Sequence, residues 1–201
     1  MKKLLIVYDS EYNATQHVAL ILKDLFMKNN AFAVDLSPVE LSNISGYDYV
    51  IIGSPIHFGK CTSKINHFLK CNKHILAQKT VALFLTCMSV KPTPNDTNIP
   101  VYIDPGFNTP EKPLKMMSFV EKTHASANYI NHVFKYCKRV PFINIAIFKG
   151  NLKINKMKLV HQFLMFFAMR LLPDIKEGNF INSKSIHDWA KQLTAYYKKS
   201  I

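Results

Sequence analysis

The chain has 201 residues, of which 48% are apolar, and its 26 Lys and Arg against 13 Asp and Glu give a formal charge of +13. This length and composition exclude gross disorder and predict a single domain over residues 1–201 with one substantial core. The charge favours anionic partners such as carboxylate ligands or acidic lipid headgroups. Because the basic residues are spread thinly, without a long run or zinc-finger spacing, nucleic acid is not expected as a partner.

The first strand and helix are predicted from residues 3 to 26. Residues 3–8 form a short apolar run without alternation, which is typical of a strand buried on both faces of a parallel sheet. The polar stretch 9–15 follows, and from Thr15 apolar residues recur at helical spacing. Backbone N–H groups and hydroxyls at such a junction favour an anion such as a phosphate. The same residue types are also helix N-caps, so both roles stay open.

Strands and helices alternate along the rest of the chain. We expect further strands at 32–36, 47–53, 80–86 and 142–148, and helices at 63–76, 119–138, 155–172 and from Ser183 or Ser185 to the C-terminus. This alternation, without hairpin signals, predicts an α/β fold with a doubly wound, five-stranded parallel sheet and helices on both faces.

Three polar segments follow predicted strands, namely 9–15, 54–60 and 87–90. Because parallel strands end at the same edge of a sheet, all three segments should open on one site there. The proline-rich residues 90–123 follow the fourth strand, and we expect them to form a long irregular insertion that acts as a lid.

The cysteines and the longest apolar segment indicate the compartment. Four well-separated cysteines form no CxxC pair, and no signal segment precedes the first strand, so we expect free thiols in a reducing cytoplasm. Residues 159–172 are apolar but shorter than the roughly 20 residues of a membrane span. Lysines at the start of the predicted helix 155–172 are typical of a segment lying in a bilayer interface, although burial in the core explains its apolar faces equally well.

In this order, the residues resemble the flavodoxin-like family, and within it the short FMN-containing protoporphyrinogen oxidases that use menaquinone. Ser10 to Thr15 is similar to the flavodoxin phosphate turn, with Asn13 at the position of the turn glycine. Residues 50–59 look like the strand and second flavin loop of that family. The tail beyond Gly150, with its Met- and Phe-rich helix, is similar to the oxidase subgroup. Asp9 and Tyr12 depart from the family pattern.

The resemblance implies that FMN is the cofactor and that all three loops hold it. The implied cofactor-binding residues are Ser10, Glu11, Tyr12, Asn13, Ala14 and Thr15 in the first loop, Ser54, Pro55, Ile56, His57, Phe58 and Gly59 in the second, and Cys87, Met88 and Ser89 in the third. The phosphate would lie at the start of the first helix, and His57 or Phe58 would stack on the flavin ring. No side chain stands out as a catalytic acid or base, and no metal site is expected.

The resemblance further implies oxidation of protoporphyrinogen IX to protoporphyrin IX in haem biosynthesis, with menaquinone or a similar membrane quinone as acceptor. Such a protein would be cytoplasmic and peripheral on the inner face of the cell membrane. The basic residues Lys91, Lys112, Lys115 and Lys122 near the expected lid suit the propionates of this substrate.

Two alternatives remain open at this stage. The first is a flavodoxin-like electron carrier or a quinone reductase, although carriers of this type are usually acidic and this chain is basic. The second is an interaction module that kept the fold without flavin, with Asp9 and Asn13 marking the loss of the phosphate site. The sequence leaves a homo-oligomer open in each case.

Overall fold

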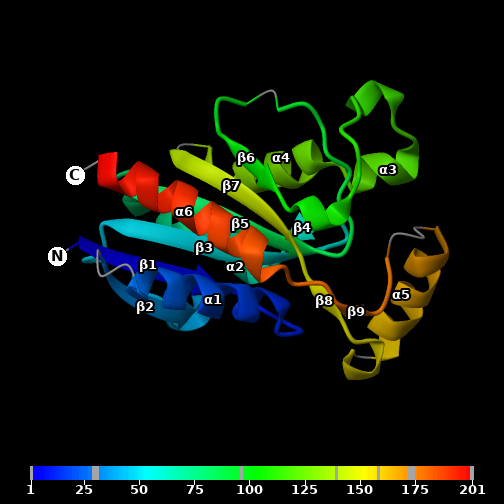
Figure 1. The fold of residues 1–201 in the computed structure, drawn as a ribbon, viewed down its shortest axis with the longest axis horizontal. Coiled ribbons are helices and arrows are strands. Elements are labelled where there is room, and N and C mark those ends of the chain that lie inside the picture. The colour runs from blue at the N-terminus through cyan, green and yellow to red at the C-terminus, as the bar shows by residue number, and fades with distance from the viewer. Residues whose placement is uncertain are drawn as a thin grey trace.

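A parallel β-sheet runs through the centre of the computed structural model, which describes residues 2–28, 32–95, 97–138, 140–157, 159–171 and 175–199 (Figure 1). Its strands lie in the order β2 (Phe32–Pro38), β1 (Lys2–Tyr8), β3 (Tyr49–His57), β5 (Thr80–Cys87), β7 (Phe142–Lys149) and β6 (Val101–Ile103). All these neighbours are parallel, and the short β4 (Lys60–Cys61) pairs antiparallel with β3. The doubly wound α/β fold is confirmed, with β6 as a parallel strand beyond the five predicted.

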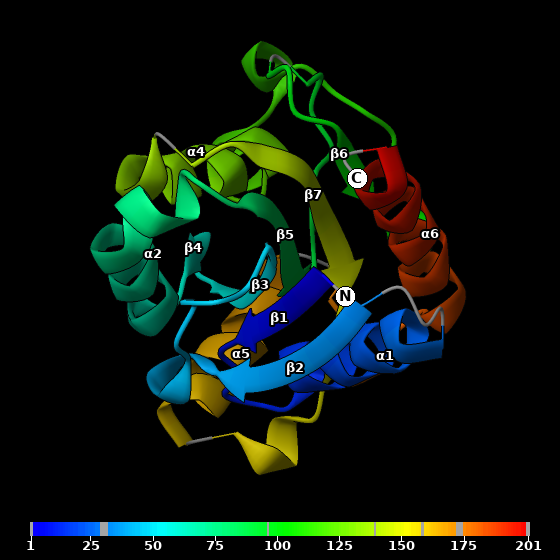
Figure 2. The same cartoon turned by 90° about the vertical axis from the view of Figure 1, so that its left-hand side faces the viewer.

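Helices cover both faces of this sheet. Figure 2 shows α1 (Ala14–Lys28) and α6 (Ser183–Lys199) on one face, and α2 (Ser63–Leu76) and α4 (Ser126–Cys137) on the other. Successive side chains of a strand point to opposite faces, so Leu4 and Ile6 pack toward α1 and α6 while Leu5 and Val7 pack in the other cluster. Burial on both faces explains why the strands read as continuous apolar runs.

The ends of two helices show how local sequence sets their start. Helix α2 has the predicted bounds because Thr62 Oγ1 accepts a hydrogen bond from the Ile65 N–H. Helix α6 begins after Asn182, whose side-chain oxygen accepts from the Ser185 N–H at 3.2 Å. The expected cap at Ser183 or Ser185 was therefore wrong by one to three residues, because Asn is as good an N-cap as Ser.

The helix predicted over 119–138 is broken into α3 (Phe119–Thr123) and α4. The Lys91 N–H donates to the His124 carbonyl at 2.8 Å, and the Ser126 N–H donates to the Lys91 carbonyl at 3.0 Å. These contacts with a distant segment take backbone groups that a continuous helix would use. Tertiary pairing thus overrides the local helical pattern.

The insertion at 90–123 is largely irregular, as expected, but a short strand anchors it to the sheet. Strand β6 pairs in parallel with β7. Directly after it, the buried carboxylate of Asp104 accepts from Gly106 N–H at 2.9 Å and from Asn182 Nδ2 and Lys149 N–H, each at 3.3 Å. These bonds tie the insertion to the end of β7 and the start of α6.

Helix α5 (Leu159–Leu171) lies apart from the four covering helices, at the carboxyl end of the sheet (Figure 1). A short ladder of β8 (Asn151–Leu152) and β9 (Gly178–Asn179) joins its two flanking segments to one another. The helix predicted over residues 155–172 starts later than expected, at Leu159, and a 3-10 turn at Ile154–Lys156 precedes it. The predicted last residue, Leu172, lies outside the described residues. In the described part of the chain, every helix is too short or too polar to cross a bilayer.

Candidate cofactor site at the carboxyl edge of the sheet

A cavity of about 620 Å³ lies beyond the carboxyl ends of β1, β3 and β5. The three predicted loops converge on it and contribute Ser10, Glu11, Tyr12, Ala14, Thr15, Pro55, Ile56, His57, Phe58, Gly59, Cys87, Met88 and Ser89. Two further predicted residues lie off its wall. Asn13 lines a smaller adjoining cavity of about 340 Å³. Ser54 is buried, with its hydroxyl donating to the Pro55 carbonyl at 2.9 Å.

Sequence reasoning missed about half of the wall. The unpredicted lining residues are Thr62, Thr86, Thr123, His124, Tyr129, Gly150, Asn151, Leu152, Met157, His161, Met165 and Ile175. Thr62 and Thr86 directly flank predicted segments, and residues 150–152 follow β7, where the rule for carboxyl ends of parallel strands also applies. The contributions of α4 and α5 depend on tertiary packing and leave no such signal.

The turn before α1 adopts the backbone that its glycine-like position requires. Asn13 has a φ of 65°, in the left-handed region that Asn tolerates better than most residues. Its carbonyl then accepts the His17 N–H at 3.0 Å as α1 begins. Ser10 Oγ accepts the Gln16 N–H at 3.3 Å, so this hydroxyl caps the helix while its own proton can still be donated. Capping and anion binding are thus compatible at this turn.

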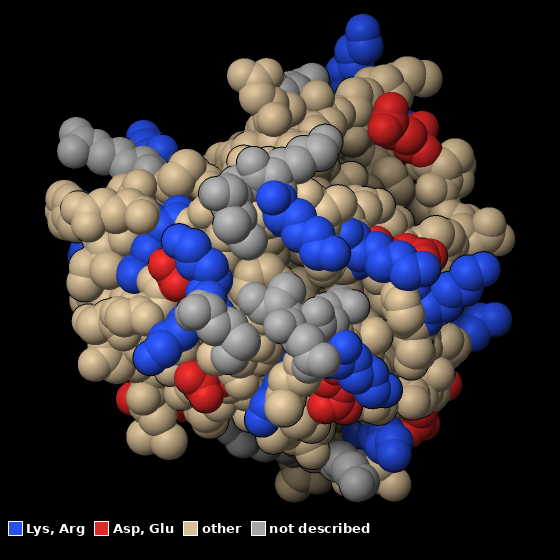
Figure 3. Space-filling model, turned by 60° about the vertical axis from the view of Figure 1, so that its left-hand side comes forward, with Lys and Arg blue, Asp and Glu red and all other residues tan. Residues whose placement is uncertain are grey.

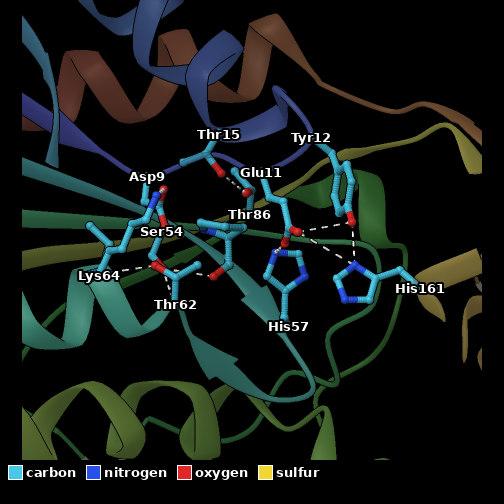
Figure 4. A network of polar contacts seen from close by, with 12 residues as sticks. Asp9, Glu11, Tyr12, Thr15, Ser54, His57, Thr62, Lys64, Thr86 and His161 are labelled. Atoms are coloured by element: carbon cyan, nitrogen blue, oxygen red, sulfur yellow. Dashed lines mark hydrogen bonds and ion pairs between the residues drawn. The ribbon is translucent and has the colours of Figure 1, made fainter. Parts of the chain in front are cut away.

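Asp9 does not line the cavity. Its backbone N–H donates to the Gly53 carbonyl at 3.1 Å, and its carboxylate lies 3.9 Å from Lys64 Nζ on α2. Figure 4 shows Asp9 beside Lys64 and apart from His57 and His161. The Asp9 carboxylate therefore faces Lys64, whose Nζ is also paired with Glu40, so the charge of Asp9 is only partly offset.

The second loop is a tight hairpin. Strand β3 continues to His57, and Phe58 and Gly59 turn the chain into β4 with φ values of 51° and 78°. Two positive φ values in a two-residue loop are typical of a type I′ turn. The predicted strand end at Gly53 and the expected lack of hairpins were wrong, because Phe-Gly lacks the usual Asn-Gly signature. A Phe in this conformation carries strain of about 1–2 kcal/mol, and its side chain is 73% exposed.

Four polar side chains meet where the phosphate turn approaches α5 (Figure 4). Tyr12 Oη lies 2.5 Å from His161 Nδ1 and donates to Glu11 Oε1 at 3.3 Å. His57 Nε2 is buried without a hydrogen-bond partner, and its distance to Glu11 Oε2 is 3.7 Å. Burial lowers the pKa of His57 below its usual value, and the charge of His161 acts in the same direction. His57 is therefore neutral at pH 7.

The third loop carries a second polar group. Ser89 is 4% exposed, and its hydroxyl has no hydrogen-bond partner among the described residues. Its carbonyl accepts from Tyr129 Oη at 3.0 Å, and His124 Nδ1 lies 3.1 Å from the same phenol oxygen. Burial raises the pKa of the Cys87 thiol, so this thiol stays protonated and is not a nucleophile. All four cysteines are free, as expected.

These features define a doubly wound α/β protein with an anion-binding turn at its first helix and a ligand cavity at the switch between strands. Residues 5–177 match the family model of the flavodoxin domain, and the chain therefore belongs to the flavodoxin family. The family membership confirms the broader resemblance seen in the sequence. It also identifies the protein as an oxidoreductase or electron carrier that uses FMN.

Comparison with solved structures finds similar chains. A short-chain flavodoxin associated with a PDU bacterial microcompartment has a TM-score of 0.51 at 11% identity, over 98% of this chain and 99% of that chain. A flavodoxin from the domain Archaea has a TM-score of 0.38 at 18% identity, over 42% and 62% of the two chains. The rubredoxin oxygen:oxidoreductase of Desulfovibrio gigas has a TM-score of 0.46 at 14% identity, over 96% and 37%. This chain thus spans less than two thirds of the latter two proteins. No curated protein sequence matches.

The residues around the cavity fit FMN. The start of α1 offers a helix N-terminus with the Ser10 hydroxyl beside it, which suits the phosphate. The unpartnered Ser89 hydroxyl needs a polar ligand atom, and the nitrogen and oxygen atoms along the edge of an isoalloxazine ring supply one. Apolar side chains such as Ile56 and Met88 complete the walls for the ring.

Proposed function

We propose that this protein is an FMN-dependent oxidoreductase that oxidises protoporphyrinogen IX to protoporphyrin IX and passes the electrons to a menaquinone or similar membrane quinone. The observation that carries this proposal is the two-sided character of α5. His161 and Met165 line the cavity, whereas Phe163 and Phe166 of the same helix are 66% and 65% exposed. An apolar rim beside a flavin site suits a large apolar donor and an acceptor that resides in a membrane.

The exposed face of α5 is continuous. Its large apolar side chains are Leu159, Val160, Phe163, Phe166 and Phe167. Positions i, i+1, i+4, i+7 and i+8 lie on one side of a helix, and Arg170 and the preceding Lys153 add exposed positive charge at its two ends. This combination favours a helix that lies in the interface of a bilayer containing anionic lipids. The alternative that the helix is buried in the core is not supported.

The basic residues of the insertion divide into two groups. Lys112 Nζ lies 3.0 Å from both carboxylate oxygens of Glu121, so its charge is already balanced. Lys115 and Lys122 are both exposed, and Lys122 directly precedes the cavity residue Thr123 in the chain. We therefore assign recognition of the substrate propionates to Lys115 and Lys122 rather than to Lys112.

The proposed roles of the loop residues follow from their positions. The turn at residues 10–15 would hold the phosphate through backbone N–H groups and the hydroxyls of Ser10 and Thr15. His57 and Phe58 would contact one face of the ring, and residues 87–89 the other. FMN, when bound, supplies the acceptor for two electrons from the substrate and passes them on. Helix α5 covers the cavity and limits the access of water to it.

The competing interpretations fit less well. An electron carrier that docks cationic partners needs an acidic surface, whereas this chain carries +13, with basic side chains spread over the face in Figure 3. The interaction module without flavin was motivated by Asp9 and Asn13. The Asp9 carboxylate faces Lys64 rather than the cavity, and Asn13 has the left-handed backbone of the missing glycine, so neither residue argues for a lost phosphate site.

Two measurements test the proposal. Purified protein should show flavin absorbance, either as isolated or after it has bound added FMN. Anaerobic reduction should bleach this absorbance, and reoxidation should restore it. Anaerobic mixing with protoporphyrinogen IX and a menaquinone analogue should then produce porphyrin fluorescence faster than the uncatalysed reaction. Reversible reduction without this acceleration would support the electron carrier, and protein that never binds FMN would contradict both flavin-dependent functions.

A further inference from the structure

We propose that His57 is the proton acceptor of this cavity, and that Glu11, Tyr12 and His161 carry the proton from His57 to solvent at α5. The inference rests on the proposed function for the identity of the substrate. It assigns the acid–base group that an oxidation of this kind requires. His57 would be a catalytic residue, whereas Glu11, Tyr12 and His161 would act through it.

The geometry places one carboxylate between two imidazoles (Figure 4). Glu11 Oε2 lies 3.7 Å from His57 Nε2, and Glu11 Oε1 lies 3.8 Å from His161 Nδ1. Tyr12 Oη bridges the second pair, at 3.3 Å from Glu11 Oε1 and 2.5 Å from His161 Nδ1. The three elements that supply these groups are the phosphate turn, the hairpin after β3 and α5. The cluster thus spans the cavity wall from the hairpin to the outer helix.

The three side chains are exposed to similar extents, at 35% for His57 and 32% for both Glu11 and His161, so water reaches each of them. The Nε2 atom of His57 is buried, however, and no hydrogen-bond partner for it lies among the described residues, so a proton on this atom has Glu11 as its nearest carboxylate. Among the described residues, no group of three or more His, Cys, Asp and Glu side chains is arranged to hold a metal ion. Proton transfer is the chemistry that this set supports.

The proton and electron balance is as follows. Over its three two-electron oxidations the substrate loses four hydrogens from its bridging carbons and two from its nitrogens. In a step that breaks one C–H bond and one N–H bond, the C–H hydrogen would leave with its electron pair, for which FMN, when bound, would supply the acceptor. The N–H electron pair stays on the substrate, and the proton forms a bond to Nδ1 of neutral His57. Nε2 then releases its proton to Glu11, from which it leaves through Tyr12 and His161 to water.

The charges around His57 act on it in opposite directions. Glu11 and Asp9 raise the pKa of His57, whereas burial, which is the largest influence, and His161 lower it. On the other side of the cavity, His124 and Tyr129 also line the wall. Burial lowers the pKa of His124, so His124 adds no charge opposite His57 at pH 7. Burial therefore has the largest effect on the pKa of His57, and Glu11, His161 and Asp9 adjust it in opposite directions.

The test is an NMR titration of the His57 imidazole in the full-length protein, with and without FMN. Glu11→Gln and Asp9→Asn should each move the His57 titration to lower pH, and His161→Gln should move it to higher pH. His74→Gln, an exposed change in the last turn of α2, is the matched control and should leave the titration unchanged. Unchanged titration in all three cavity variants, or shifts of the opposite sign, would overturn the proposal.

Turnover gives a second readout that separates the two proposals. The turnover rate should fall as the pH drops through the range in which His57 becomes protonated. In Glu11→Gln and His161→Gln, this acid limb of the pH–rate profile should shift by the same amount as the midpoint of the His57 titration measured by NMR. His57→Gln should lower kcat by roughly 10²- to 10⁴-fold and remove that limb. Retention of the limb in His57→Gln would contradict the role of His57. Failure of wild-type turnover with intact NMR shifts would instead count against the substrate assignment.

Discussion

The hydroxyl oxygens of Thr15 and Thr86 lie 2.8 Å apart in the buried interior, although 71 positions separate the two residues in the chain. Thr15 is in the first turn of α1, and Thr86 is near the end of β5. Their hydrogen bond fixes the phosphate turn against the strand that carries the third loop. This bond thus adds a side-chain contact to the strand pairing that joins the first and third parts of the cavity.

The first prediction concerns this bond. Thr15→Val keeps the shape of the side chain but leaves the buried Thr86 hydroxyl without its partner, at a cost of about 1–3 kcal/mol in the free energy of unfolding. Together with Ser10→Ala, it should also weaken FMN binding by roughly tenfold or more, which fluorescence titration would measure. Thr194→Val, which removes a hydroxyl bonded within α6, is the control. Unchanged FMN affinity in the double variant would refute the assigned phosphate turn.

The second prediction concerns Gly53 in β3. A Cβ at this position would lie 2.2 Å from Cζ of Phe84, so Gly53→Ala should force the core to shift and lower the free energy of unfolding by about 1–3 kcal/mol. Gly150→Ala is the control, because its nearest neighbour would be Ala14 Cβ at an ordinary 3.5 Å. Urea unfolding of both variants measures the difference. Equal stability of the two variants would show that Phe84 does not pack against Gly53.

The third prediction separates the strain of Phe58 from its binding role. Phe58→Asn gives the Asn-Gly pair that type I′ turns favour, so it should raise the stability of the protein without FMN by about 1 kcal/mol. The same change removes an aromatic contact with the flavin ring, which is worth about 0.5–1.5 kcal/mol. It should therefore weaken FMN binding by roughly two- to tenfold. Phe119→Asn, which changes another exposed phenylalanine, should do neither. A drop in stability without FMN would contradict the strain at position 58.

The fourth prediction concerns the exposed face of α5. Changing Phe163, Phe166 and Phe167 to Ser should weaken binding to vesicles that contain anionic lipids, by roughly tenfold for each phenylalanine at about 1.5 kcal/mol. Because these side chains are exposed, FMN affinity and thermal stability should stay close to those of the wild type. The control is Leu20→Ser with Met27→Ser, two exposed apolar positions on α1. Equal loss in both variants would exclude a specific role for α5.

The sequence predicted those parts of the fold that depend on local pattern. Apolar runs such as residues 50–52 marked the central strands, and the amphipathic spacing over residues 63–76 gave the bounds of α2. The convergence of three loops followed from a general property of parallel sheets, without any contact being known. The position of Asn13 in the family pattern indicated its left-handed backbone, which the structure contains.

The parts that escaped prediction depend on contacts between distant segments. Lys91 breaks the helix after Thr123 by pairing with the backbone on either side of Ala125. Strand β6 has three residues and becomes a strand only because β7 lies beside it. The hairpin at Phe58 carries a residue that its backbone disfavours, so sequence preference pointed away from it. In each case, tertiary structure outweighs local preference.

Strand β6 also has a consequence for how the molecule behaves among its own copies. Strand β7 carries the apolar run Phe142 to Phe148 and would otherwise present its backbone along the margin of the sheet. Such a margin is a template on which another chain can add by strand pairing. Strand β6 of the insertion pairs with residues 145–147 of β7. The edge strand of the sheet at this position is therefore β6, which is only three residues long. The insertion thereby also protects the protein from aggregation.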